Sequence, residues 1–192
     1  MEQRFDERRS KIRIGNVIKS TSKMDEIVNK VAQSALEVFD LEDYFPDDYV
    51  VELDISQWLE EGVLLKESDF REQLKTVNWN AFEDKYVALN CKTDAILPAW
   101  TFALVTVHLS DFALKTIQGS KKDAIIVWYQ DILNKLDYTN YFQKPVILKG
   151  CSKKKVPNEV YVLAIQKLQP IAKSIMFGEA CSAVPLYKKK QS

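Results

Sequence analysis

Hydrophobic residues take up a helical spacing directly after a polar first stretch of the chain. Residues 1–23 show no amphipathic period. From Met24 onward, five apolar residues fall on one face of a helix. They are Ile27, Val28, Val31, Ala35 and Val38. The pattern predicts a polar N-terminal extension over residues 1–23, which we expect to be disordered, and an amphipathic helix over residues 24–39.

The polarity pattern then changes to shorter elements. An apolar, β-branched run predicts a strand over residues 49–55. A helical period follows over residues 68–77, where Ser68 is the expected N-cap. Together with the helix over residues 24–39, these elements form an N-terminal part that contains helix and strand.

The second half of the chain alternates regularly between strands and helices. The predicted strands cover residues 85–91, 112–119, 145–151 and 173–181. The predicted helices cover residues 96–109, 121–138 and 157–172, and the first of them is apolar enough to be buried. Such alternation is typical of a mostly parallel sheet covered by helices. The sequence therefore predicts an α/β fold, with residues 24–192 forming a single domain.

Each cysteine of the chain stands at or just beyond the end of a predicted strand. Cys91 and Cys151 end the strands over residues 85–91 and 145–151, and Cys181 follows the apolar run of the last strand. The intervals, 151 − 91 = 60 and 181 − 151 = 30 residues, equal two and one strand–helix–strand units of ≈30 residues. If the four C-terminal strands are numbered in chain order, right-handed crossovers allow the order 2-1-3-4. The three cysteine strands are then neighbours, about 4.8 Å apart, so the thiols are expected to meet at the carboxyl edge.

Three converging thiols are typical of a site for a soft metal. Zinc and iron–sulfur clusters both accept thiolate ligands, and both usually take four ligands from the protein. The sequence therefore predicts a metal site of Cys91, Cys151 and Cys181, with a fourth position for water, substrate, a partner or a carboxylate. Residues expected to line this site are Thr93, Asp94, Lys149 and Glu179. Thr93 and Asp94 are alternatively placed to cap the following helix.

Two other functions explain the same cysteines. Lys149 and residues 153–155 flank Cys151 with positive charge, which favours a reactive thiolate and would suit the nucleophile of a thiol-dependent sulfur transferase. Cysteine also packs as a small apolar residue, so a protein-interaction module with three buried thiols is a further alternative. The sequence leaves open whether the protein is an enzyme.

Composition and charge limit the classes of binding partner and the cellular compartment that we expect for this protein. The 192 residues carry 27 basic and 27 acidic side chains, so no overall positive field attracts nucleic acid or an anionic membrane. No apolar run approaches the roughly 20 residues of a membrane span, and the N-terminus lacks the apolar core of a secretory signal. Three cysteines without close pairs fit a reducing compartment. We expect a cytoplasmic protein with no nucleic-acid or membrane partner.

Several catalytic motifs are missing from the sequence. The single histidine, His108, lies within the apolar helix over residues 96–109, where a helix-face or core role is expected. There is no C-x-x-C pair, and the five glycines do not cluster into a phosphate-binding loop. An acidic stretch lacks the spacing of a calcium loop and is interpreted as a solvated turn. It contains Glu42, Asp43, Asp47 and Asp48.

Four stretches in this order resemble a bacterial family known as domain of unknown function 2480. They are "EIVNKVAQSALEVFDLEDYFP", "DKYVALNCKTDAILPAW", "VILKGCSKKKVP" and "KSIMFGEACSAVPLYKK". The resemblance covers residues 24–192 and leaves out residues 1–23. It implies an association with iron–sulfur cluster assembly, and hence iron–sulfur assembly proteins as partners and an accessory role for Cys91, Cys151 and Cys181.

Overall fold

The computed structural model describes residues 36–150, 153–179 and 182–190. The extension over residues 1–23, most of the helix predicted over residues 24–39, and both Cys151 and Cys181 lie outside this part. The chain divides into two compact units. Among the described residues, the three-stranded unit comprises residues 46–128, and the four-stranded unit comprises residues 36–45 and those from Tyr129 onward. The first unit is therefore inserted in the chain of the second.

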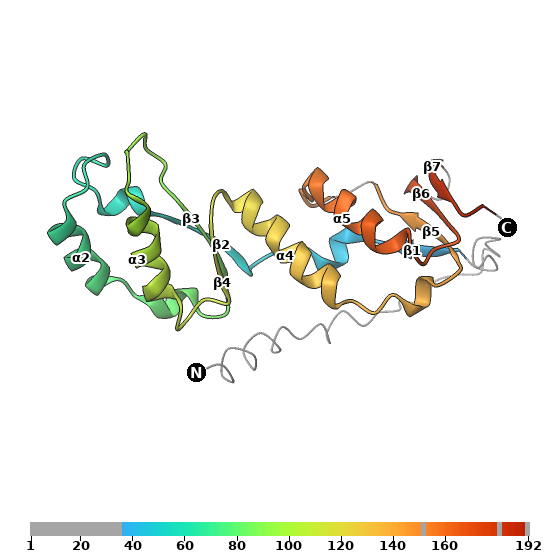
Figure 1. Cartoon of the computed structure of the whole chain (residues 1–192), viewed down its shortest axis with the longest axis horizontal. Helices are drawn as coiled ribbons and strands as arrows, with labels where there is room; N and C mark the ends of the chain where they lie inside the picture. Colours follow the sequence, from blue (N-terminus) through green and yellow to red (C-terminus); the bar gives the residue numbers. More distant parts are fainter. Residues whose placement is uncertain (1–35, 151–152, 180–181, 191–192) are drawn as a thin grey trace. The chain divides into compact units, whose positions relative to one another are not determined.

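The three-stranded unit is built on a wholly parallel sheet (Figure 1). Its strands are β2 (Val50–Asp54), β3 (Tyr86–Asn90) and β4 (Lys115–Gln118), in the order β2-β3-β4. The crossovers carry α2 (Glu67–Thr76) and α3 (Ala99–Leu109), with the short 3-10 helices η3 (Ile55–Trp58) and η4 (Trp79–Phe82). Because β3 is central and covered, residues 86–89 are all buried.

The two faces of this sheet pack against different helices. One face forms a single core with α2 and α3, to which Leu53, Leu89 and Phe70 contribute. On the other face, Trp128 of α4 (Lys121–Lys135) lies edge-on to Tyr86, with ring centroids 5.1 Å apart. Trp128 also stacks on Tyr49 at 5.2 Å. Both faces of this parallel sheet are therefore covered, as parallel strands require.

Helix α3 is only half buried, which corrects the expectation of a buried helix. Thr101, Val105 and Leu109 face the core, whereas Ala103 and Val107 are exposed, Val107 by 67%. A helix that is apolar on all sides is fully buried only when a second layer covers its outer face. In the described part of the chain, the outer residues of α3 remain accessible.

The four-stranded unit contains a mostly parallel sheet with one antiparallel edge strand. Its strands are β1 (Glu37–Phe39), β5 (Pro145–Leu148), β6 (Ser174–Glu179) and β7 (Ser182–Lys188). The order is β1-β5-β6-β7, and β7 runs antiparallel to β6. Helix α5 (Asn158–Leu168) connects β5 to β6, and η2 (Leu41–Tyr44) and η5 (Thr139–Tyr141) complete the unit.

One face of this sheet is densely packed. Phe39, Leu148 and Phe177 are register partners across β1, β5 and β6, so their side chains lie on the same face. Phe39 contacts the rings of Tyr138 and Tyr141, and Phe177 lies edge-on to Tyr161 of α5 at 5.5 Å. This face is therefore covered by helix α5 and by the aromatic residues that follow α4.

The α/β architecture with mostly parallel strands is confirmed, but the single sheet with strand order 2-1-3-4 is wrong. The predicted neighbours β3–β4 and β5–β6 do pair. The predicted contact between β3 and β5 does not form, because β3 already lies between β2 and β4, and β5 lies between β1 and β6. A strand has only two edges, so neither can accept a further neighbour.

The second neighbour of β5 is β1, which falls in a segment whose sequence predicts a helix. Val38 fits the amphipathic period of the helix predicted over residues 24–39, yet residues 37–39 form β1 and pair with Val146, Ile147 and Leu148. Tertiary pairing overrides local periodicity at this point. Whether residues 24–192 unfold as one domain stays a prediction, for which a test is given below. No helix in the described part combines the length and the apolar character needed to cross a membrane.

Serine caps helix α4 but not helix α2. Ser68, the expected N-cap of α2, lies inside that helix, and Lys66 occupies the cap position. Ser120, by contrast, directly precedes α4 and forms a reciprocal cap with Asp123. The Ser120 N–H donates to Asp123 Oδ2 at 2.8 Å, and the Asp123 N–H donates to Ser120 Oγ at 3.3 Å. Free N–H groups of the first turn are thereby satisfied.

We expect Ser120→Ala to lower the free energy of unfolding by about 1 kcal/mol at pH 7, the usual value of such a cap. The Ser120 hydroxyl and N–H hold the pKa of Asp123 below its ordinary value. A lowered pKa in the folded state stabilises the fold above the ordinary carboxyl pKa, and this contribution disappears as the pH falls through the lowered value. The difference between wild type and Asp123→Ala in urea denaturation should therefore shrink below pH 4. Lys121→Ala, which leaves the hydrogen bonds between Ser120 and Asp123 in place, should show no such trend.

Candidate functional site

Cys91 lies at the carboxyl end of β3, as predicted. Its Sγ lies 3.3 Å from Thr93 Oγ1, and the single hydroxyl proton of Thr93 is donated to the carbonyl of Gly62. Because the Thr93 hydroxyl donates to Gly62, its oxygen is placed to accept a hydrogen bond from the Cys91 thiol. Cys91 is partly buried.

The polar residues near Cys91 form hydrogen bonds with neighbouring groups of the protein. Asp54 Oδ1 accepts from the N–H groups of Ser56 and Lys92, at 3.0 and 3.2 Å. The Asn90 side-chain amide donates to Glu52. Thr93 and Asp94 do not cap α3, because the helix begins at Ala99 with Pro98 at the cap position. These contacts tie the loop after β3 to the end of β2.

A second cluster of charged side chains lies at the carboxyl edge of the four-stranded sheet. We call it the edge cluster; it consists of Asp40, Glu42, Asp43, Lys149 and Glu179. Asp40 directly follows β1, Lys149 directly follows β5, and Glu179 is the last residue of β6. Carboxyl ends of parallel strands share one edge, which is where open α/β sheets bind ligands. Lys149 and Glu179, two of the residues predicted from sequence, are therefore placed on adjacent strands.

An ion pair joins the first two strands at this edge. Lys149 Nζ lies 2.5 Å from Asp40 Oδ2, and the two side chains are 31% and 18% exposed. The Lys149 N–H also donates to the Phe39 carbonyl at 3.0 Å, which continues the β1–β5 ladder. At the opposite end of the same strand pair, Lys144 pairs with Glu37 at 2.7 Å. The position of Asp40 relative to β5 is thus fixed by backbone and side-chain contacts.

The loop after β5 is held by the short helix η2. Glu42 Oε1 accepts from the Lys154 N–H at 2.6 Å. Asp40 caps η2 by accepting from the Glu42 N–H at 2.9 Å. The Lys154 ammonium lies 5.4 Å from the centre of the Phe45 ring, within cation–π range. The segment over residues 40–45 therefore positions acidic groups beside the loop that follows Lys149.

The charged groups of the edge cluster shift one another's pKa values. Partial desolvation and the neighbouring carboxylates of Asp40 and Glu42 raise the pKa of Asp43. The hydrogen bond from Lys149 to Asp40, followed by the charges of Asp40, Glu42 and Glu179, raises the pKa of Lys149. Lys149 is thus a permanent cation at neutral pH. The Lys154 ammonium also acts on Asp43 and lowers its pKa, so it offsets part of the negative charge of the four carboxylates.

Two glycines bring the ends of β5 and β6 into close contact. A Cβ atom on Gly150 would lie 2.8 Å from the Phe177 ring and 3.3 Å from the Gly178 Cα. Cys151 is the next residue after Gly150, and Cys181 is the third after Gly178. Both cysteines lie outside the described residues, so the structure does not locate their thiols. What it does locate are the strand ends from which they follow.

Sequence reasoning missed the acidic part of the edge cluster. The helix predicted over residues 24–39 leaves no strand end before Asp40, so this residue is not assigned to the sheet edge. Glu42 and Asp43 are interpreted as part of a solvated turn. The sequence "EVFD" could have indicated this position, because the acidic residue Asp40 directly follows a short run that contains a β-branched and an aromatic residue. The structure does not place Cys91 in this cluster, because its strand belongs to the sheet of the other unit. The argument that strand neighbours bring Cys91 to Cys151 therefore fails.

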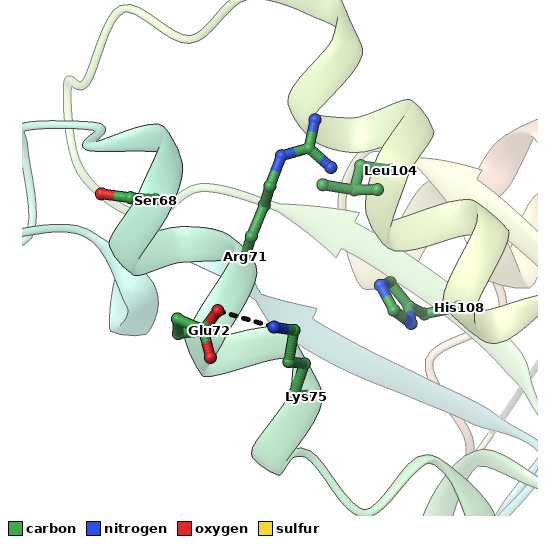
Figure 2. A pocket seen from close by; sticks show the side chains of 6 residues that line it. All are labelled: Ser68, Arg71, Glu72, Lys75, Leu104 and His108. Atoms are coloured by element: carbon green, nitrogen blue, oxygen red, sulfur yellow. Dashed lines mark hydrogen bonds and ion pairs between the residues drawn. The ribbon is translucent and has the colours of Figure 1, made fainter.

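A groove lies between α2 and α3 (Figure 2). Its lining residues are Ser68, Arg71, Glu72, Lys75, Leu104 and His108. Lys75 pairs with Glu72 at 2.6 Å, and Arg71 pairs with Glu67 at 2.9 Å. His108 stacks on Trp79, with centroids 5.2 Å apart, so its predicted helix-face role is confirmed. Both ion pairs lie on exposed side chains of α2.

Metal-ligating side chains do not form a complete site among residues 36–150, 153–179 and 182–190. No group of three or more histidine, cysteine, aspartate or glutamate side chains is arranged there to hold a metal ion.

These features define an α/β protein with charged groups at the carboxyl edge of a parallel sheet. The chain belongs to the family described as protein of unknown function (DUF2480), whose model matches residues 25–189. The resemblance noted in the sequence is thereby confirmed. No curated protein and no solved structure matches the chain.

Proposed function

We propose that this protein binds a metal ion, for which Zn²⁺ is the best candidate, at the carboxyl edge of the four-stranded sheet. The ligands are the thiolates of Cys151 and Cys181, together with carboxylates such as Glu179 and Asp43. The observation that carries the proposal is the close approach of Gly150 to Gly178, because the chain continues from these two strand ends to Cys151 and Cys181. Thiolate and carboxylate oxygen are both ordinary zinc ligands.

Zinc suits this set of ligands better than an iron–sulfur cluster does. Clusters usually take four cysteines, and the chain has three, of which Cys91 follows a strand of the other sheet. A mononuclear ion needs only four donors of mixed type. A role beside iron–sulfur assembly proteins rests on the family resemblance, and we place the protein in the cytoplasm because its three cysteines lack a pairing pattern.

The edge cluster also weighs against the sulfur-transfer alternative. A nucleophilic Cys151 needs surrounding positive charge to lower its pKa. Lys149 is engaged by Asp40, and the Lys154 ammonium lies over Phe45. The chain continues to Cys151 from the strand end that carries the edge cluster, and negative charge of this kind favours a thiol over a free thiolate. A bound cation reverses this preference, because it stabilises thiolate ligands directly.

Zinc binding by single cysteine variants tests the proposal. Purified, reduced protein is titrated with Zn²⁺ against a competing chelator, and bound metal is measured by elemental analysis. We expect Cys151→Ser and Cys181→Ser each to lower the affinity at least tenfold, because one thiolate ligand is lost. Cys91→Ser is the matched control and should bind like wild type.

Three results would contradict the proposal. Wild-type protein that binds no zinc above the level of the double variant Cys151→Ser/Cys181→Ser would remove the site. Equal losses in all three single variants would restore the three-cysteine site predicted from the sequence. Visible absorbance and stoichiometric iron in protein purified without oxygen would replace zinc with an iron–sulfur cluster.

A further inference from the structure

The outer side of helix α3 is an accessible apolar surface in the described part of the chain. Ala99, Ala103 and Val107 follow one another at intervals of four residues and are all exposed. Ile96, which is 97% exposed, continues the apolar surface beyond the first turn of the helix. We call these four residues the α3 face. The outer side of a surface helix is normally charged or polar, so an apolar stripe there indicates a contact surface.

The composition of this segment suits contact with an identical chain. Residues 95–110 contain no aspartate, glutamate, lysine or arginine, although 28% of the chain is charged. In a dimer with two-fold symmetry, the same patch of both subunits forms the interface, so the patch must be complementary to itself. An uncharged helix meets this condition, because its own copy brings no like charge against it.

We propose that the α3 face is the contact surface of a symmetric dimer, in which α3 of a second copy of the chain packs antiparallel against it. With the two-fold axis at Ala103, the two Ala103 side chains meet at the axis, and Ala99 lies opposite Val107 of the second copy. A small residue at the centre lets the helix axes approach to about 8 Å, and each larger valine then fills the space beside an alanine. This inference does not rest on the proposed metal site.

Helix α2 lies beside α3 and shows which of its residues come near the axis. The Arg71 guanidinium carbon is 5.7 Å from the centre of the Trp100 ring, and one turn later Lys75 lines the groove together with His108 (Figure 2). The two helices therefore run in the same direction, and Ala103 is level with the turn between Arg71 and Lys75. A two-fold axis at Ala103 thus passes α2 just after Arg71.

The charges of α2 are complementary across this axis. An axis that lies in the interface, perpendicular to α3, also places α2 of the second copy antiparallel and opposite to α2. Arg71 then faces Glu72 of the second copy, and Glu72 faces Arg71 of the second copy. A parallel arrangement would instead set Arg71 against Arg71. Because opposite charges across an interface favour one partner and one orientation, these residues select an antiparallel second copy.

The side chains needed for these contacts are accessible. Arg71 and Glu72 are exposed and take part in ion pairs on the surface of α2, with Glu67 and Lys75. Exposed ion pairs of this kind contribute only about 0–1 kcal/mol, so exchange for pairs between chains costs little. The interface is small, because a helix of 11 residues is only about 17 Å long. We therefore expect a reversible dimer rather than a permanent one.

Sedimentation equilibrium of the full-length protein, in the presence of a reductant, tests the dimer. We expect wild type to change from monomer to dimer between about 5 and 500 µM, the range of a weak specific contact. Val107→Asp should weaken dimerisation at least tenfold, because it places a carboxylate within the apolar α3 face. Val162→Asp is the matched control. Val162 is 59% exposed on α5, so the same change outside the α3 face should leave dimerisation as in wild type.

Exchange of charges on α2 tests the orientation. Arg71→Glu should weaken dimerisation at least threefold, because carboxylates then face each other across the axis. The double variant Arg71→Glu/Glu72→Arg should restore dimerisation to within about twofold of wild type, since opposite charges face each other again. Circular dichroism checks that each variant is folded.

Three results would overturn the proposal. Wild type that stays monomeric up to about 500 µM would assign the α3 face to a different occupant. Equal weakening by Val107→Asp and Val162→Asp would show that the dimer does not use this face. A double variant that dimerises no better than Arg71→Glu would contradict the antiparallel arrangement.

Discussion

Phe70→Ala is expected to lower the free energy of unfolding by about 3–5 kcal/mol, the range measured for removing a buried phenylalanine. Phe70 lies on α2 and is completely buried. Its ring lies edge-on to Trp58 at 5.9 Å and to Trp100 at 6.3 Å. Truncation removes both aromatic contacts and leaves a cavity between α2 and the sheet, which rigid neighbouring rings cannot easily fill.

Urea denaturation monitored by tryptophan fluorescence measures this effect. Phe142→Ala is the matched control, because Phe142 is 60% exposed and its loss should change stability by no more than about 0.5 kcal/mol. A Phe70→Ala loss below about 1 kcal/mol would contradict the packing described for α2.

The same experiment tests whether residues 24–192 form a single cooperative domain. All four tryptophans, at positions 58, 79, 100 and 128, lie in the three-stranded unit, so fluorescence reports on that unit alone. Far-ultraviolet circular dichroism reports on both units. We expect the two signals to give coincident transitions, shifted together by Phe70→Ala, if the chain unfolds in one step. Separate transitions, of which only one moves, would establish two domains.

Gly178→Ala is the second substitution with a large expected effect. Gly178 has φ of +124°, a conformation that residues with a side chain rarely adopt. A Cβ atom there would also lie 2.6 Å from the Ser182 carbonyl oxygen, which belongs to the backbone of β7. The strand pair must therefore shift, at a cost of about 1–3 kcal/mol in folding free energy.

The shift should also affect the proposed metal site. Glu179 follows Gly178 and pairs with Ser182, and residues 180–181 connect the two strands. We expect Gly178→Ala to lower zinc affinity at least tenfold in the chelator competition, because the segment bearing Cys181 moves relative to β5. Gly62→Ala serves as control. Its φ of +74° also strains the backbone, but its Cβ would meet only the Thr93 side chain at 3.5 Å. A loss of zinc affinity in Gly62→Ala as large as in Gly178→Ala would show that general destabilisation explains the result.

The local elements of this fold could largely be predicted from residue order. The helical period over residues 121–138 matches α4, and the apolar runs over residues 85–91 and 145–151 contain β3 and β5. These patterns depend on neighbours within one or two turns, and such information is present in the sequence. The weakest predictions fell where two patterns overlap, as at Val38, which suits a helical stripe and a short strand equally.

The site was predicted only in part, because it depends on which strands become neighbours. Lys149 is assigned to the site because it flanks Cys151, and Glu179 because its carboxylate could serve as a fourth ligand; β5–β6 pairing brings their strands together. Asp40 was missed because β1 was not recognised as a strand. Cys91 was assigned to the same edge because one sheet was assumed, whereas β3 is enclosed by β2 and β4.

The sequence alone determined the α/β class, the parallel character of the strands and the placement of cysteines at or just beyond strand ends. Spacing along the chain carries that information, because each strand–helix–strand unit is a local construction. Only the tertiary structure decided that the strands form two sheets and that β1 lies beside β5. Strand pairing joins residues more than 100 positions apart, such as Glu37 and Val146, and no local pattern records which distant edge a strand will meet. The pairing of β1 with β5 also brings Asp40 beside Lys149, so this part of the edge cluster could be identified only from the folded chain.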